Sequence, residues 1–347
     1  MEKKSKKEKN LKILAVCFFV LIFLNDTTVY NVYFENFSNV FVGISCCILL
    51  IFIANTGKLF INKKFWAFIF FWFITVLTSC LIAGFTRMTF VRICYWTVTI
   101  TMVTQMYLAK IDLKSTIYSV CKIFCIWCLL CYFYASFNLN FLPTTHVSKE
   151  LAYNHYAIKL YGGIISIPIS HIRLPGSISL YRLDRPFGEP GIAQIFMNYG
   201  IIYYSFILKE STKKEKKWFY LFVLGSILTF SLTGYIILFS ILIFKLYQEK
   251  KYTYCFIFSF IAIVIGSFMV FQKVNTFSYS DRTGDYKFMI STIFENLPFG
   301  IGIGNTNSLE HYIIEGTDNE SIGFYCRIII SFSTIWYIWL GILLCFI

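Results

Sequence analysis

Arginine is the residue type that offers the clearest chemistry in this sequence. The chain contains seven arginines: Arg87, Arg92, Arg173, Arg182, Arg185, Arg282 and Arg327. A guanidinium group presents a planar fork of N–H donors, binds phosphate through paired hydrogen bonds and stays charged at any relevant pH. The seven side chains are therefore candidate ligands for a phosphate-bearing molecule. The alternative is that chance or codon usage set their positions.

Three other residues are candidates for a general base, which must lie within hydrogen-bond reach of the hydroxyl that it deprotonates. Glu189 lies in the motif RLDRPFGEPG, which starts at Arg182, whereas His311 and Asp318 lie farther along the chain. Glu189 also precedes Pro190, and a Glu-Pro pair favours the first turn of a helix without any catalytic role. The sequence does not choose among the three.

Two further motifs resemble ligand sites but have simpler explanations. Cys121, Cys125, Cys128 and Cys131 have a spacing similar to iron–sulfur ligation, yet they lie among Phe, Ile, Trp and Leu residues. Small polarisable side chains on a packing face explain them better. The GxGxG pattern in PFGIGIGN at 298–305 lacks the strand–turn–helix unit of a nucleotide-binding fold. We therefore expect no metal and no cofactor.

The composition indicates which elements must position these residues. Of the 347 residues, 57% are hydrophobic and 14% are charged, and the mean hydropathy is +0.66. An ordinary soluble domain has about 25% charged residues, so this chain cannot cover a globular surface with polar side chains. Disordered, collagenous and disulfide-rich secreted classes are excluded as well. We predict an all-α polytopic integral membrane protein.

Ten apolar runs predict about ten transmembrane helices, because each run is long enough, or nearly so, to cross a bilayer. They are 11–24, 39–54, 65–83, 88–109, 115–137, 188–208, 218–231, 234–248, 252–271 and 321–347. The stretch 218–248 is assigned to two helices, because the lysine clusters at both of its ends belong on the cytoplasmic side. Its turn is expected at 231–234, where the sequence SLTG supplies small polar residues.

In this topology the lysines of the short connections lie on the cytoplasmic side and the arginines lie toward the external side. With a cytoplasmic N-terminus, the cytoplasmic segments carry 19 positive charges, all lysine, whereas the three short external connections carry only Arg87. This asymmetry obeys the positive-inside rule. Every arginine maps to the external side or to the outer half of a span, and Arg92 and Arg327 lie where a charge needs a partner or a wet cavity. The net charge of +13 therefore indicates membrane topology and an anionic lipid ligand, not nucleic acid.

Two long periplasmic loops interrupt the predicted spans. The expected organisation is a five-span bundle (1–137), a first loop (138–187), spans six to nine (188–271), a second loop (272–320) and a last span (321–347). The first loop is basic and the second is acidic. One expectation is that the first binds phosphate and the second binds sugar hydroxyls. The alternative is that the two loops pair with each other. Weak alternation of apolar and polar residues at 161–177 predicts a short hairpin or a segment on the membrane surface.

An ordered set of motifs resembles the bacterial polysaccharide repeat-unit polymerases of the Wzy type, in the O-antigen ligase and polymerase superfamily. The set comprises RLDRPFGEPG, SLTG, DRTG, PFGIGIGN and the sequence DNE at 318–320, and it covers roughly residues 180–345. The first five spans are similar only in hydropathy. The resemblance implies a glycosyltransferase of the inner membrane. It would move a growing glycan from undecaprenyl diphosphate to the non-reducing sugar of a lipid-linked repeat unit at the periplasmic face.

The resemblance also implies roles for particular residues. Arg182 and Arg185 match family arginines of the first loop, Arg282 matches that of the second loop, and Glu189 matches an acidic residue in a motif whose spacing is compressed here. The His-Asn pair of ligases is absent, since His311 lacks the Asn and the pair Asp318-Asn319 lacks the His. We assign catalysis to Glu189, Arg282, His311 and Asp318. Substrate binding is assigned to Arg87, Arg92, Arg173, Arg182, Arg185 and Arg327.

The reaction must stabilise a leaving diphosphate and deprotonate a sugar hydroxyl, and arginines can do the first without a metal. The expected partners are an undecaprenyl-diphosphate-linked oligosaccharide, membrane lipid and a chain-length regulator protein. The alternatives are an O-antigen ligase and a lipid-linked oligosaccharide transporter or flippase. A transporter places charged residues along a path through its spans. Here they gather at one face, which favours the enzyme.

Overall fold

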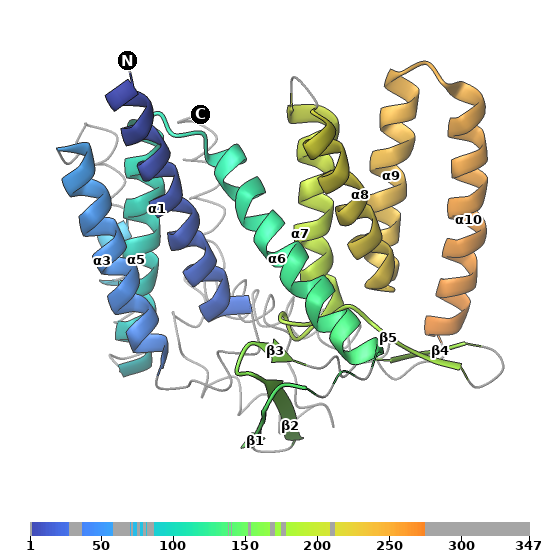
Figure 1. Ribbon diagram of the computed structural model, residues 1–347, viewed down its shortest axis with the longest axis horizontal. Helices are drawn as coiled ribbons and strands as arrows, with labels where there is room; N and C mark the ends of the chain where they lie inside the picture. The colour runs from blue at the N-terminus through green and yellow to red at the C-terminus, as the bar shows by residue number, and fades with distance from the viewer. Residues whose placement is uncertain are drawn as a thin grey trace. The chain divides into compact units, whose positions relative to one another are not determined.

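The computed structural model describes most of the first 274 residues (Figure 1). The described residues are 2–27, 37–57, 70, 72–74, 77–78, 81, 87–137, 139, 141–151, 154–166, 171–174, 178–208 and 212–274. The chain divides into two compact units. Unit 1 contains Met1–Thr56 and Lys110–Phe271, and unit 2 contains Gly57–Ala109 and Gln272–Ile347.

The described part of unit 2 is dominated by one helix, α5 (Arg87–Leu108). It occupies the predicted fourth span. The indole Nε1 of Trp72 donates to the Thr97 hydroxyl at 2.8 Å, which connects α5 to the segment before it. The predicted third span, 65–83, lies largely outside the described residues, and the last span, 321–347, lies wholly outside them.

Unit 1 is a set of helices with apolar sequences. They are α1 (Glu2–Thr27), α3 (Phe37–Thr56), α6 (Leu113–Ser136), α7 (Pro190–Ile202), a π-helical continuation (Tyr203–Ile207), α8 (Lys213–Leu228), α9 (Leu232–Gln248) and α10 (Tyr252–Val274). Helix α7 packs against α6, α8 and α9, and α1 packs against α3 and α6. Each of these helices overlaps a predicted apolar run, although α1 begins nine residues and α8 five residues before the predicted run.

Local signals set the ends of these helices. The Asp112 carboxylate accepts hydrogen bonds from the backbone N–H groups of Lys114 and Ser115 and so caps α6. The Thr212 hydroxyl caps α8 in the same way. Between α8 and α9 the backbone breaks at Thr229–Ser231, where Phe230 has a φ of +46°. The prediction that 218–248 forms two helices is confirmed, with a turn slightly earlier than expected.

Strands occur only between residues 144 and 181 of the described chain. One antiparallel sheet has the order β1 (Thr144–Leu151), β2 (Asn154–Tyr161) and β3 (Ile165–Ser166), and a second pairs β4 (His171–Leu174) with β5 (Ile178–Tyr181). The described protein is thus mostly helical, as predicted, with two small sheets in the first long loop. The stretch 161–177, predicted as a short hairpin or a surface segment, contributes to two hairpins: β3 pairs with the end of β2, and β4 pairs with β5.

One described helix, α6, is long and apolar enough to cross a membrane by itself. Shorter apolar helical stretches occur at Val40–Thr56, Leu232–Gln248 and Tyr252–Val264. This composition agrees with membrane association. The count of ten spans stays a prediction.

The lysine-bearing segments of unit 1 meet at one end of its helices. Lys12 of α1 donates to the Ser115 hydroxyl near the start of α6, and the backbone carbonyl of Lys114 accepts from the Tyr199 hydroxyl of α7. Lys245, near the end of α9, lies over the Phe219 ring near the start of α8. The strands follow the other end of α6, as Figure 1 shows.

Candidate functional site

The structure describes three of the ten predicted site residues with their side chains: Arg182, Arg185 and Glu189. For Arg87 and Arg92 in α5, and Arg173 in β4, only the backbone is described. The other four predicted residues, Arg282, His311, Asp318 and Arg327, lie outside the described residues. The site is therefore built from segment 182–189, which leads into α7.

The first residue of this segment binds the turn between α8 and α9. Arg182 donates from Nε to the Thr229 carbonyl at 3.2 Å and from Nη2 to the Phe230 carbonyl at 2.9 Å. The backbone N–H of Leu183 donates to the Leu228 carbonyl at 2.8 Å. The last carbonyls of a helix have no partner within it, and a cationic donor suits the negative end of the helix dipole. Arg182 thus completes the C-terminal end of α8.

The middle of the segment is buried, including two charged residues. Leu183, Asp184, Arg185 and Phe187 have at most 3% of their surface exposed. The Arg185 Nε lies 4.0 Å from Asp184 Oδ1, which partly compensates both charges inside the protein. The Phe187 ring stacks on Phe196 of α7 with their centroids 4.5 Å apart. In this conformation the Arg185 side chain is buried, with 4% of its surface exposed.

The end of the segment is exposed at Gly188 and Glu189, whereas Arg182 at its start is partly exposed. Gly188 has a φ of +68°, a value that glycine adopts without strain, and the chain emerges there from the buried run. Glu189 is the residue before α7, and Pro190 occupies the first helical position. The Glu189 side chain makes no capping hydrogen bond with the helix. The Glu-Pro helix start is confirmed, and the carboxylate is left exposed for another ligand.

A buried polar network holds α7 against α8. Gln194 donates from Nε2 to the Ser226 hydroxyl at 2.9 Å and accepts at Oε1 from the Thr229 hydroxyl at 2.7 Å. Ser226 donates in turn to Asn198 Oδ1 at 3.1 Å. Thr229 therefore joins Gln194 through its side chain and Arg182 through its carbonyl. As a result, segment 182–194 is fixed to the end of α8 on both sides of Glu189.

The SLTG motif has two roles. Ser231 lies in the turn and precedes α9, as predicted for a small polar residue. Gly234, in contrast, lies in the first turn of α9 against Gln194, and a Cβ atom there would come within 1.5 Å of Gln194 Cδ. The glycine is needed for close helix packing and not for the turn.

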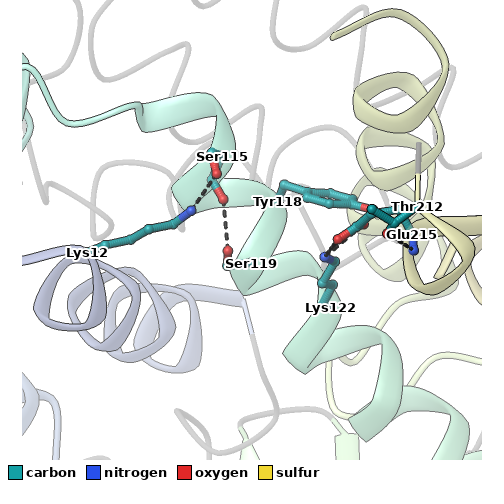
Figure 2. A network of polar contacts seen from close by, with 7 residues as sticks. All are labelled: Lys12, Ser115, Tyr118, Ser119, Lys122, Thr212 and Glu215. Atoms are coloured by element: carbon teal, nitrogen blue, oxygen red, sulfur yellow. Dashed lines mark hydrogen bonds and ion pairs between the residues drawn. The ribbon is translucent and has the colours of Figure 1, made fainter. Parts of the chain in front are cut away.

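A second polar cluster, which was not predicted from the sequence, lies at the lysine-rich end of unit 1 (Figure 2). Lys122 of α6 donates to both carboxylate oxygens of Glu215 in α8, at 2.9 and 3.0 Å, and the Tyr118 hydroxyl donates to Glu215 at 2.7 Å. Lys122 also lies over the rings of Tyr118 and Trp218. The available signal was that Lys122 is the only charged residue in the run 115–137.

Glu215 is only partly exposed, with 20% of its side chain accessible. Partial burial raises the pKa of its carboxyl group. The hydrogen bonds from Tyr118 and Lys122, together with the charges of Lys122 and Lys214, outweigh that effect and hold the pKa below its ordinary value. The Glu215 carboxyl group is therefore ionised at neutral pH.

The cysteines of α6 pack in the interior of unit 1. Cys121, Cys125, Cys128 and Cys131 are buried and have free thiols. Among the described residues, no group of His, Cys, Asp and Glu side chains could hold a metal ion. The packing explanation of the cysteine spacing fits this arrangement.

The geometry around Glu189 combines an exposed carboxylate with a rigid support. Such a carboxylate can accept a proton from a hydroxyl group or bind sugar hydroxyls. Comparison of the chain with protein-family models, curated proteins and solved structures finds no match.

Proposed function

We propose that this chain is a multi-pass membrane glycosyltransferase that polymerises undecaprenyl-diphosphate-linked oligosaccharide repeat units into surface polysaccharide, either O-antigen or capsule. The observation that carries the proposal is the Glu189 carboxylate, which is exposed, makes no capping bond and is presented by a buried segment fixed to α8. A base that must meet a hydroxyl of a large lipid-linked sugar needs this combination of access and fixed position.

The proposed setting is the bacterial inner membrane, with a cytoplasmic N-terminus and the two long loops in the periplasm. The lysine-bearing segments around Lys12, Lys114 and Lys245 share one end of unit 1, which is the arrangement that a positive-inside topology requires. Glu189 follows the strand-containing first loop, away from the lysine-rich ends of α6 and α8. These placements support a periplasmic site.

In the proposed reaction the sugar hydroxyl of the acceptor gives its proton to Glu189 and attacks the anomeric carbon of the donor glycan. The bond from that carbon to the diphosphate oxygen breaks, and undecaprenyl diphosphate leaves with the bonding electron pair. His311 and Asp318 are the alternative bases. Arginines stabilise the charge on the leaving diphosphate by charge-assisted hydrogen bonds. The proposed partners also include membrane lipid and a chain-length regulator protein.

The arginines divide into two groups in this proposal. Arg182 and Arg185 have intramolecular partners, so their first role is to hold the segment that carries Glu189. The diphosphate is then bound mainly by the other arginines, which are Arg87, Arg92, Arg173, Arg282 and Arg327.

One observation favours transport of the same lipid-linked oligosaccharide as a second candidate function. Lys122 lies more than two turns inside α6 and pairs with Glu215, and charged residues within membrane spans often mark a transport path. However, the two charges satisfy each other and Glu215 lies in the first turn of α8. The enzyme therefore remains the function that the geometry supports best.

Deletion of the gene, followed by gel analysis of surface polysaccharide, separates the candidates. We expect loss of long chains with a single repeat unit still attached to the lipid core, restored by the wild-type gene. Complete absence of repeat units would indicate a flippase, and polymer retained on the lipid carrier would indicate a ligase. The purified enzyme is expected to stay active in EDTA, and inhibition would contradict arginine-only stabilisation of the diphosphate.

A further inference from the structure

The start of α8 has an unusual division of charge. Its first residues read KKEKKWFY, from Lys213 to Tyr220. The four lysines, Lys213, Lys214, Lys216 and Lys217, are exposed, whereas Glu215 is only partly exposed and faces α6. We call these four lysines the α8 lysine patch. One turn of helix thus directs its acidic residue inward and its basic residues outward.

The partner of Glu215 comes from another helix and not from the patch. Figure 2 shows the Glu215 carboxylate between Tyr118 and Lys122, both on α6. Lys122 donates to both of its oxygens, so the carboxylate is already compensated. No lysine of the patch forms an ion pair with another residue in the described part of the chain. Lys214 acts on the Glu215 carboxylate through its charge alone, and the exposed side chains of the patch can reach an external anion.

The neighbouring surface continues the basic character. At the α9–α10 turn Lys250 is exposed, while Lys251 pairs with Glu249 at 2.6 Å. Lys245 of α9 lies 5.0 Å from the ring centroids of both Tyr204 and Phe219, which fixes α9 beside the start of α8. These contacts bring a second set of lysines close to the patch.

Tyrosines are exposed next to these lysines. Four of them, on α8, α9 and α10, have more than half of their side-chain surface accessible: Tyr220, Tyr247, Tyr252 and Tyr254. Amphipathic rings of Tyr and Trp concentrate at the headgroup level of a bilayer, where the ring is apolar on its body and polar at its tip. Exposed tyrosines beside lysines with no carboxylate partner match the surface of an anionic leaflet.

We propose that the α8 lysine patch binds the phosphate headgroups of anionic phospholipids in the leaflet that this end of unit 1 faces. A lysine ammonium is a compact point charge with three donors, which suits a headgroup phosphate without fixing one orientation. The attraction to an anionic leaflet acts over about 10 Å at ordinary ionic strength. This interaction does not depend on the proposed glycosyl transfer.

Binding of fluorescent lipid to the purified full-length protein tests the proposal. The probes are short-chain phosphatidylglycerol and phosphatidylcholine in neutral-detergent micelles, read by anisotropy, with inorganic phosphate as a competitor. The patch variant replaces Lys213, Lys214, Lys216 and Lys217 with Gln. The matched control replaces Lys3, Lys4, Lys6 and Lys7 at the start of α1 and removes the same number of charges.

We expect wild-type protein to bind phosphatidylglycerol in preference to phosphatidylcholine, and high salt to weaken that binding. The patch variant should bind at least roughly 10-fold more weakly, because each lysine near an anionic surface contributes about fivefold. The α1 control should weaken binding less than the patch variant does, because the proposed headgroup contact is on α8. Replacement of the four lysines with Arg keeps the charge and should keep the binding, which separates loss of the site from loss of the fold.

Three results would overturn the proposal. Equal weakening in the patch and α1 variants would show general charge attraction and no site on α8. Unchanged binding in the patch variant would show that these lysines do not contact the lipid. Competition by inorganic phosphate at the concentration of the lipid would assign the patch to a soluble anion.

Discussion

The side chain of Gln194 occupies the space that a Cβ atom on Gly234 would need, 1.5 Å from its Cδ atom. This contact joins α7 to α9 through two residues that are 40 positions apart in the sequence. Gln194 also binds Ser226 and Thr229 of the α8 end, so its side chain cannot move without loss of two buried hydrogen bonds. The packing of α7, α8 and α9 therefore depends on the absence of a side chain at Gly234.

Gly234→Ala should therefore destabilise the protein by about 1–3 kcal/mol, the range for overpacked sites. The measurement is the midpoint of thermal unfolding of the purified protein in detergent. Gly266→Ala in α10 is the matched control, because a Cβ there has no heavy atom within 4 Å. It should leave stability unchanged or raise it by about 0.5–1 kcal/mol. Equal midpoints for both variants would contradict the Gln194 contact.

Glu189→Gln should reduce polymerisation roughly 100-fold or more, because a general base contributes factors of about 10²–10⁴. Its unfolding midpoint should barely change, since the carboxylate makes no capping hydrogen bond and its effect on the helix dipole is at most about 1 kcal/mol. Glu249→Gln, at an exposed turn of the opposite end, is the control and should keep wild-type activity. Normal polymer from Glu189→Gln would transfer the role to His311 or Asp318.

Arg182→Ala should lower stability as well as activity. It removes two charge-assisted hydrogen bonds to the carbonyls of Thr229 and Phe230, for a loss of about 1.5–3 kcal/mol per bond at most. Arg182→Lys should recover part of the unfolding midpoint, because an ammonium group can reach one carbonyl but not reproduce the fork. A loss of polymer with an unchanged midpoint would show instead that Arg182 acts mainly on the substrate.

The Lys122–Glu215 pair should make stability depend on pH on the acidic side. The pKa of Glu215 is lowered in the folded protein, so its stabilising contribution is present above the ordinary value of 4.5 and is lost as pH falls through the lowered folded value. Thermal unfolding measured from neutral pH to below this value should show the loss. In Glu215→Gln this part of the pH dependence should be absent.

Lys122→Met provides an independent check of the same pair. Without the ammonium group, the Glu215 pKa should rise toward its ordinary value, and the acid-induced loss of stability should begin at a higher pH. If stability in this variant fell with pH as it does in wild type, Lys122 would not lower the pKa of Glu215 in solution.

The sequence by itself determined the helices of unit 1 and their ends. Apolar runs, lysine clusters and the Glu189–Pro190 pair are local properties, and each acts on the backbone within a few residues. For this reason the two helices in 218–248 and the start of α7 at Pro190 were predictable.

Only the tertiary structure decided which polar groups meet. Arg182 reaches a carbonyl 47 residues away, Gln194 a hydroxyl 35 residues away and Lys122 a carboxylate 93 residues away. Such partners depend on the direction and spacing of packed helices, which no local sequence pattern predicts. The guanidinium groups of Arg182 and Arg185 looked like phosphate ligands in the sequence because arginine binds carbonyls, carboxylates and phosphates with the same fork of donors. The fold gives both side chains partners inside the chain, because burial and distance decide which of these acceptors is within reach, and their binding of phosphate stays a prediction.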